Sequence, residues 1–243
     1  MIDDHPISEE RLAANIAAVR SAIKEAAERV GRRPEEITLI AVSKTRPVAM
    51  VEMAYRLGIT DFGENRVQEA LPKIAEFRPQ GLRWHMIGHL QSNKARKVVS
   101  AFASVHSVDS LHLAQALNRY VELEQRERLP VLLEVNIAGE QSKAGIRGAE
   151  VPVLARQIAE LPHLELQGLM TVAPLVENPE EVRPVFRELR SLRDRLRDEL
   201  PDCSWHHLSM GMTDDYCIAI EEGATLVRVG RAIFGERMYK GDQ

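Results

Sequence analysis

The segment Ile37-Thr38-Leu39-Ile40-Ala41-Val42-Ser43-Lys44 is a short apolar run that ends in two polar residues. A continuous apolar run is typical of a strand in a parallel sheet that is buried on both faces. We therefore predict a buried parallel strand at 37–42, with Ser43 and then Lys44 after its carboxyl end.

Further apolar runs of similar length follow along the chain, and a helical pattern separates each run from the next. The predicted strands lie at 37–42, 59–62, 83–87, 103–108, 131–137, 164–170, 205–209 and 226–229, and the predicted helices at 8–30, 48–57, 66–77, 93–101, 111–126, 150–161, 179–200, 213–222 and, briefly, after Gly230. Strands that alternate with helices pair in parallel, and eight such units close into a barrel. We predict a (β/α)8 TIM barrel with an extra N-terminal helix.

An open, doubly wound sheet is the alternative fold. That fold commonly carries a G-x-G-x-x-G motif after its first strand, and no such motif follows Val42. No P-loop pattern occurs in the sequence either. The chain has 243 residues, which suits one barrel domain over 1–243 because such barrels take about 250 residues.

Composition and charge argue against several classes of protein. The net charge is -4, which lacks the basic excess of a dedicated nucleic-acid-binding protein. No apolar run reaches the roughly 18 residues of a membrane span, and the N-terminus does not resemble a signal peptide. Cys203 and Cys217 are too few for a disulfide framework. We expect a cytoplasmic protein that binds neither nucleic acid nor membrane.

Lys44 is the leading candidate for chemistry, because active residues of such barrels lie at the carboxyl ends of the strands. A desolvated lysine amine forms Schiff bases with carbonyl compounds. An ordinary lysine that reaches solvent is the alternative at this position. Lys143 is a competitor, but it lies further from the end of its strand and is expected in a loop.

The last two loops predicted at the carboxyl end of the barrel are suited to a phosphate group. They contain Ser209-Met210-Gly211-Met212-Thr213 and Val229-Gly230-Arg231-Ala232. Glycine allows backbone N–H groups to approach an anion closely, and both loops precede helices. A lysine with a phosphate site suggests pyridoxal 5′-phosphate (PLP), although Schiff-base aldolases that act on sugar phosphates use similar parts.

Several motifs in the chain resemble those of one known family. In order they are Ala41-Val42-Ser43-Lys44-Thr45, Phe62-Gly63-Glu64-Asn65, Trp84-His85-Met86-Ile87-Gly88-His89-Leu90-Gln91-Ser92-Asn93-Lys94, Ser142-Lys143-Ala144-Gly145, Gly168-Leu169-Met170, Leu208-Ser209-Met210-Gly211-Met212-Thr213-Asp214-Asp215 and Val227-Arg228-Val229-Gly230-Arg231-Ala232-Ile233-Phe234-Gly235. The sequence resembles the pyridoxal phosphate homeostasis protein family, also called the proline synthetase co-transcribed family. That family is similar in fold to the N-terminal barrel of alanine racemase.

The resemblance implies a role in the cofactor site for seven residues. Lys44 would carry PLP as a Schiff base, Asn65 would line the pocket, and Arg228 would face the pyridine nitrogen. The phosphate would be bound by Ser209, in the loop that also contains Met210, and by the backbone of Gly230 and Arg231. Arg231 departs from the small hydroxyl residue common in the family, so only its backbone N–H is carried over.

The predicted role of Arg228 argues against aminotransferase chemistry. An arginine only donates hydrogen bonds, so the pyridine nitrogen would stay unprotonated and the ring would be a weak electron sink. Racemisation usually needs a second acid or base, which alanine racemase takes from a separate β domain, and we expect none after Gly235. The resemblance therefore implies PLP binding for cofactor and amino-acid homeostasis, without catalytic residues.

Two other functional classes stay open. The first is a PLP-dependent amino-acid racemase or Schiff-base lyase, and the second is an interaction protein that uses bound cofactor as a signal. Apo-PLP enzymes are the expected acceptors of the cofactor, and a monomer is expected. His85 and His89 are four residues apart, but they lie at a strand end and in the loop after it, so we predict no metal site.

Overall fold

Parallel strands close into a barrel in the computed structural model of this protein, which describes residues 7–140 and 144–236. In that part of the chain the barrel strands are β1 (Thr38–Val42), β2 (Asp61–Glu64), β3 (Arg83–Met86), β4 (Ser104–Val108), β5 (Leu129–Asn136), β7 (Leu164–Met170), β8 (His207–Ser209) and β9 (Leu226–Val229). Strand β1 pairs with both β2 and β9, and β4 pairs with β5, so the ring is complete. The predicted (β/α)8 TIM barrel is confirmed.

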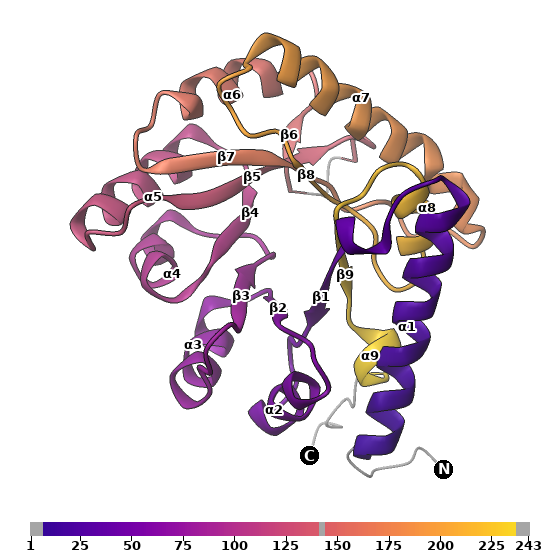
Figure 1. Ribbon diagram of the computed structural model, residues 1–243. Coiled ribbons are helices and arrows are strands. Elements are labelled where there is room, and N and C mark those ends of the chain that lie inside the picture. Colours follow the sequence, from indigo (N-terminus) through magenta and orange to yellow (C-terminus); the bar gives the residue numbers. More distant parts are fainter. Residues whose placement is uncertain (1–6, 141–143, 237–243) are drawn as a thin grey trace.

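Helices surround the barrel on its outer side (Figure 1). Their bounds are α1 (Glu9–Arg29), α2 (Val48–Arg56), α3 (Val67–Glu76), α4 (Ala95–Ala101), α5 (Leu111–Leu123), α6 (Val151–Ala159), α7 (Arg183–Glu199), α8 (Tyr216–Glu221) and α9 (Arg231–Phe234). The extra N-terminal helix is α1, and Ser8 caps it by accepting a hydrogen bond from the Arg11 amide at 3.2 Å. Helix α1 lies alongside α8 and α9, and Asn15 donates to the carbonyl of Ile233.

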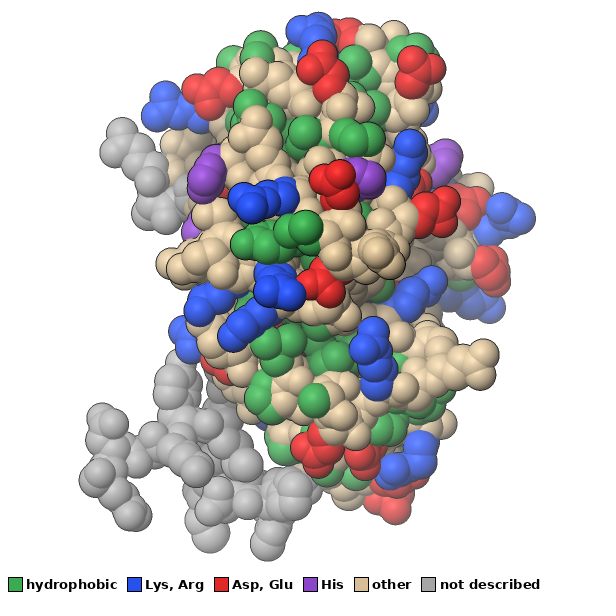
Figure 2. All heavy atoms as spheres, turned by 90° about the vertical axis from the view of Figure 1, so that its left-hand side faces the viewer, with side chains coloured by type: hydrophobic (Ala, Val, Ile, Leu, Met, Phe, Trp, Pro, Cys, Tyr) green, Lys and Arg blue, Asp and Glu red, His purple; other side chains and the backbone are tan. Residues whose placement is uncertain are grey.

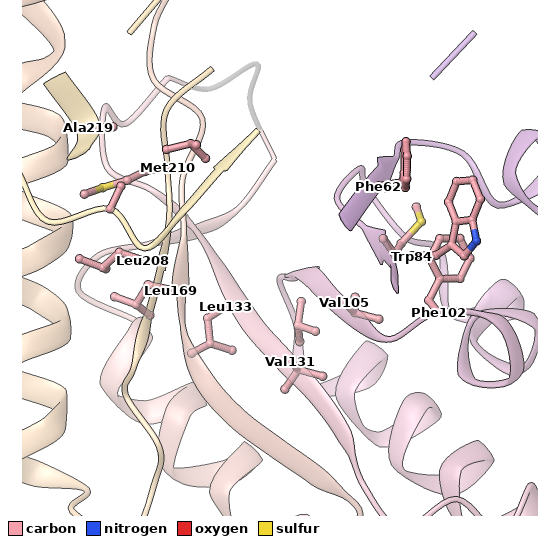
Figure 3. Packing of buried hydrophobic residues seen from close by; sticks show 14 of the residues in the cluster. Phe62, Trp84, Phe102, Val105, Val131, Leu133, Leu169, Leu208, Met210 and Ala219 are labelled. Atoms are coloured by element: carbon pink, nitrogen blue, oxygen red, sulfur yellow. The ribbon is translucent and has the colours of Figure 1, made fainter. Parts of the chain in front are cut away.

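The main hydrophobic core lies between the outward faces of the strands and the helices. Figure 3 shows Phe62, Trp84 and Phe102 together on one side of the barrel, with Val105 facing Val131 on neighbouring strands. A second, smaller apolar cluster fills the barrel interior, and its members are Ile40, Leu132, Met170 and Leu226. Burial of both faces explains why the strands have continuous apolar runs.

Several element bounds differ from the sequence prediction. Strand β6 (Ile146–Arg147) pairs with β5 outside the ring, and its two residues are too few to show a periodic pattern. Strand β8 begins at His207 rather than at 205. Helix α8 begins at Tyr216 because Asp215 accepts a hydrogen bond from the Met212 amide at 2.6 Å, which closes a turn before the helix.

The exterior carries charges of both signs. Figure 2 shows Lys and Arg side chains interspersed with Asp and Glu side chains over one face of the molecule. Mixed charges agree with the small net charge of -4. Within residues 7–140 and 144–236, no helix combines the length and apolarity needed to cross a membrane.

Candidate functional site

A pocket of about 670 Å³ lies at the end of the barrel where the strands terminate, here called the C-terminal mouth. Five of the predicted cofactor residues line it, namely Lys44, Asn65, Arg228, Gly230 and Arg231. They follow or end strands β1, β2 and β9, which are neighbours in the barrel. The parallel arrangement therefore collects residues that are far apart in the sequence at one mouth, as it does in other barrels of this kind.

Lys44 lies two residues after the end of β1 and is partly buried in the pocket wall. The next residue, Thr45, has φ of 64°, a conformation that is uncommon for a β-branched residue. Before Lys44, the Ser43 hydroxyl donates to Glu64 Oε1 at 2.7 Å. The hydrogen bond of Ser43 and the backbone conformation of Thr45 thus define the local structure on the two sides of the lysine.

Asn65 lines the pocket, and its side chain carries a polar atom that the protein itself does not satisfy. Its Oδ1 is buried and has no hydrogen-bond partner among the described residues. Gly88 permits this position, because a Cβ on residue 88 would lie 2.4 Å from the Asn65 carbonyl oxygen. A buried acceptor without a partner is rare in proteins, so Asn65 Oδ1 suits a ligand that donates a hydrogen bond.

Arg228 is a buried cation at the base of the pocket, and only 4% of it is exposed. Its Nη1 donates to Ser209 Oγ at 2.7 Å, and its Nη2 donates to the Thr171 carbonyl at 2.8 Å. Burial lowers the pKa of Arg228 to about 10, so the group still carries its charge near pH 7. The two bonds use two of its five N–H donors.

Ser209 and Met210 lie behind the pocket wall rather than on it. Ser209 is fully buried, and its hydroxyl contacts Arg228 and His106. Met210 is buried beside Ala219 in the main core (Figure 3), and its amide donates to the Leu226 carbonyl at 3.1 Å. The structure thus connects Ser209 to the pocket through Arg228. The phosphate contact of Ser209 and the cofactor-binding role of Met210 stay predictions.

Gly230 and Arg231 stand where β9 passes into α9. The first N–H groups of a helix have no acceptor inside the helix. In α9 the Ala232 amide donates to Thr213 Oγ1 at 3.4 Å, so the amides of Gly230 and Arg231 are the ones assigned to an anion. The Arg231 guanidinium, in contrast, forms an ion pair with Asp214 and a second with Glu236 at 3.7 Å. Its charge is therefore compensated, which agrees with the assignment of only its backbone to phosphate.

Glu134 is a buried carboxyl near the end of β5 that the sequence prediction did not include. Its Oε2 has no hydrogen-bond partner among the described residues. Burial, followed by the like charge of Asp109, raises the pKa of Glu134 to about 7. The carboxyl also feels the charge of Arg228. Because Glu134 lies inside a strand, a search for polar residues just after each strand could not find it.

A group of polar residues also lies inside the barrel, and the sequence prediction did not connect its members. We call it the interior chain, and its members are Asp61, His85, Ser104, His106, Ser209 and Arg228. Ser104 and His106 alternate with Val105 in β4. This alternation was an available signal, because every second residue of a barrel strand points inward.

Histidines do not form a metal site in the part of the chain that the structure describes, where no three potential ligands come together. His85 belongs to the interior chain, whereas His89 lies 3.3 Å from Asp109. Lys143, the competitor of Lys44, lies outside the described residues, as does Ser142 of the same Ser142-Lys143-Ala144-Gly145 motif.

Comparison with known proteins decides the family. The sequence model of the family described as "Alanine racemase, N-terminal domain" matches residues 7–238. Pyridoxal phosphate homeostasis protein from Aquifex aeolicus is 42% identical over 224 residues, which cover 92% of this chain and 97% of the relative. The protein of the same name from Escherichia coli strain K12 is 46% identical over 234 residues, or 94% and 97% of the two chains. This chain belongs to the pyridoxal phosphate homeostasis protein family.

Solved structures include a relative with PLP bound. The structure titled PipY of Synechococcus elongatus PCC7942 with PLP bound has a TM-score of 0.82 and is 38% identical. The alignment covers 92% of this chain and 100% of PipY. The likeness extends over the whole barrel, so the family assignment and the observed fold agree.

Proposed function

We propose that this protein binds PLP in the pocket at the C-terminal mouth, holds it as a Schiff base on Lys44, and serves cofactor and amino-acid homeostasis in the cytoplasm. One observation carries the proposal: a lysine, an unsatisfied amide oxygen and a buried arginine line a single pocket. The names of the relatives and the PLP-bound structure of PipY support it. A single domain over 1–243 remains part of the proposal.

The residues of the pocket fit the parts of this cofactor. Asn65 Oδ1 is an acceptor that needs a donor, and Arg228 has donors beyond the two that the protein uses. Gly230 has no side chain that could block access to its backbone. A Cβ at this position would lie 3.3 Å from the Val42 carbonyl oxygen, which is a tight contact. Backbone N–H groups at the start of α9 are suited to a phosphate.

Bound PLP supplies an aldehyde that condenses with a primary amine and releases water. Lys44 Nζ provides that amine, and it must be deprotonated when it attacks. The contact between Ser43 and Glu64 orients the backbone that carries Lys44. An incoming primary amine, from an amino acid or from the lysine of an apo-enzyme, would replace Lys44 by amine exchange, in which Lys44 Nζ leaves as the free amine and takes up the proton that the incoming amine loses. Release to an acceptor therefore needs no additional catalytic group.

Arg228 favours holding the cofactor over turning over a substrate. It donates hydrogen bonds and does not protonate a ring nitrogen, because its pKa of about 10 leaves it charged near pH 7. A ring nitrogen without a proton withdraws electrons weakly, which disfavours carbanion chemistry. We therefore propose a protein without catalytic turnover.

The alternative function is a PLP-dependent racemase or Schiff-base lyase, and one observation favours it. Glu134 has a pKa of about 7 and lies near enough to Arg228 to feel its charge. A carboxyl that titrates near neutral pH is suited to general acid–base catalysis. Incubation of the purified protein with alanine and serine, followed by measurement of chirality and keto-acid release, separates the two functions. Turnover near 1 s⁻¹ that is lost in Glu134→Gln would establish the alternative.

Borohydride reduction of the PLP-loaded protein tests the Schiff base directly. We expect one reduced adduct on the peptide that contains Lys44, together with a visible absorption band. Lys44→Ala should lose both, whereas Lys97→Ala, an exposed lysine on α4, should keep both. A stable reduced adduct that persists in Lys44→Ala would refute the assignment.

Apo-PLP enzymes are the proposed acceptors, and a monomer is the proposed state. The test mixes an apo-aminotransferase either with the PLP-loaded protein or with an equal concentration of free PLP, and both reactions contain an amine that traps free PLP. We expect the PLP-loaded protein to restore transaminase activity faster. Light scattering on the same sample should give one chain of 27.4 kDa. Restoration no faster than with free PLP would argue against direct transfer.

A further inference from the structure

The interior chain begins at the end of the barrel where the strands start, here called the N-terminal mouth. There Arg83 pairs with both carboxylate oxygens of Asp61, at 2.7 and 2.8 Å. Asp61 Oδ1 also lies 2.8 Å from His85 Nε2, and His85 Nδ1 lies 2.8 Å from Ser104 Oγ. A pocket of about 290 Å³ opens beside these residues. The Thr60 hydroxyl also donates to Asp61 Oδ2 at 2.8 Å, so the chain begins at a carboxylate that accepts four hydrogen bonds from three side chains.

The interior chain continues from the N-terminal mouth to Arg228, which lines the pocket at the C-terminal mouth. Ser104 Oγ lies 3.0 Å from His106 Nε2, and His106 Nδ1 lies 3.0 Å from Ser209 Oγ. Ser209 Oγ in turn accepts from Arg228 Nη1 at 2.7 Å. His106 and Ser209 are almost completely buried, so water does not replace these bonds. Every link between Asp61 and Arg228 is thus within hydrogen-bond distance.

The two ends of the chain fix the direction of every proton in it. Arg228 can only donate, and an ionised carboxylate such as Asp61 can only accept. If each hydroxyl proton is used, Ser209 donates to His106 Nδ1 and Ser104 donates to His85 Nδ1. Each imidazole then carries its proton on Nε2, because Nδ1 accepts. No other neutral arrangement satisfies both serine hydroxyls within the chain.

The electrostatics of the chain agree with this arrangement. Burial raises the pKa of Asp61, but hydrogen bonds from His85 and Arg83 outweigh burial and hold that pKa well below its usual range. Burial, followed by the charges of His85 and Arg228, lowers the pKa of His106 far below its usual value. Asp61 is therefore a carboxylate and His106 a neutral imidazole near pH 7.

We propose that the interior chain is a positioning device, with His106 as its central residue, that fixes the Arg228 guanidinium from the opposite mouth of the barrel. This inference rests on the proposed function, because its consequence concerns the PLP that Arg228 would face. Ser209, aligned by His106, accepts one Nη1 proton, and the Thr171 carbonyl accepts one from Nη2. The remaining donors of Arg228 are thereby held in one orientation toward the pocket.

The first test uses the full-length protein without PLP, so it does not depend on the proposed function. Two-bond ¹H–¹⁵N spectra of histidine-labelled protein report the tautomer of each imidazole, and His85→Gln and His106→Asn assign the signals. We expect neutral Nε2–H forms for both His85 and His106 at pH 7. An Nδ1–H form or an imidazolium at His106 would overturn the proposed direction of the chain.

The second test measures the affinity for PLP and the visible absorption maximum of the loaded protein. His106→Leu should weaken PLP affinity about tenfold to a hundredfold and shift the absorption maximum, because a charged group loses an aligned partner. His106→Asn, whose amide oxygen can accept from Ser209, should recover most of both. The matched control is His207→Leu, since His207 lines the same N-terminal pocket but contacts Thr225 instead of the chain.

The outcomes separate this inference from the proposed function. If the wild-type protein does not take up PLP, the proposed function fails, and the tautomers still decide whether the chain exists. If PLP binds and His106→Leu behaves like His207→Leu, His106 does not position Arg228 and the inference is overturned. Equal losses in His106→Leu and His106→Asn would also overturn it, because they would indicate packing rather than hydrogen bonding.

Discussion

Lys73 Nζ lies 2.7 Å from Glu64 Oε1 and 2.8 Å from the Ser43 carbonyl, so one ammonium joins the ends of β1 and β2. The Glu64 side chain is fully buried and that of Lys73 is 12% exposed. Both carbonyl and carboxylate belong to residues that directly precede pocket residues, Lys44 and Asn65. The ion pair therefore fixes the residues that directly precede these two pocket residues.

Removal of the Lys73 ammonium should destabilise the protein strongly. Lys73→Met leaves the Glu64 carboxylate buried without its partner, which typically costs about 3–5 kcal/mol. Urea unfolding followed by circular dichroism measures the loss. The control is Lys24→Met, because Lys24 forms an exposed ion pair with Glu28 at 3.8 Å. This substitution should change the free energy of unfolding by less than about 1 kcal/mol. Similar losses in both variants would contradict the role given to Lys73.

Gly88 should be sensitive to the addition of one methyl group. In Gly88→Ala the new Cβ would lie 2.4 Å from the Asn65 carbonyl oxygen, so the Asn65 backbone must move. We expect a destabilisation of about 1–3 kcal/mol and weaker PLP affinity. Gly148→Ala is the control, since a Cβ there meets nothing within 4 Å. Thermal unfolding and PLP titration of both variants check this, and unchanged affinity in Gly88→Ala would count against a role of Asn65.

Glu134 should make the stability of the protein depend on pH. Its pKa is raised from 4.5 to about 7, so the folded state binds the proton more tightly than the unfolded state. The resulting stabilisation is complete below about pH 4.5 and is lost as the pH rises through about 7. Glu134→Gln removes this loss, and its stability relative to wild type should therefore rise by roughly 2–3 kcal/mol between about pH 5 and pH 8.

Denaturant unfolding of both proteins at the two pH values measures this difference. Glu188→Gln, an exposed position of α7, serves as the control and should show the same pH dependence as wild type. A constant difference between Glu134→Gln and wild type at both pH values would show that the carboxyl does not titrate in this range.

The Arg231 side chain should contribute little to PLP retention. Its charge is compensated by Asp214 and Glu236, and only its backbone N–H is assigned to the phosphate. Arg231→Ala should therefore change PLP affinity by less than about threefold, the effect of a weak surface charge. Gly230→Val, which crowds the Val42 carbonyl, should weaken it clearly more. A large loss in Arg231→Ala, measured by equilibrium dialysis of PLP, would instead assign the guanidinium to the phosphate.

Sequence patterns were sufficient for the elements that repeat. The apolar run before Lys44 predicted β1, and the alternation of runs and helical patterns predicted the barrel. The two-residue strand β6 and the late start of α8 at Tyr216 escaped prediction. Both depend on contacts of single residues, such as the bond between Asp215 and the Met212 amide, which leave no periodic signal.

The candidate site was predictable only in part. Lys44, Asn65, Arg228, Gly230 and Arg231 were expected at one mouth because they follow or end strands, and the structure places all five in one pocket. Their binding roles stay predictions. Ser209 and Met210 were expected beside them on the same reasoning, yet both are fully buried and neither lines the pocket. Which way a residue at a strand end points depends on its neighbours in the folded barrel.

By itself the sequence determined the periodicity of the chain, and with it the barrel and the end of the barrel that carries Lys44, because hydrophobic spacing is a local property. Only the tertiary structure decided which polar residues inside the strands meet. Asp61 and Arg228 lie at the two ends of the interior chain, near opposite mouths of the barrel. Four side chains from three strands connect them. Such a connection arises only when the strands close into a ring and their inward faces come within hydrogen-bond distance.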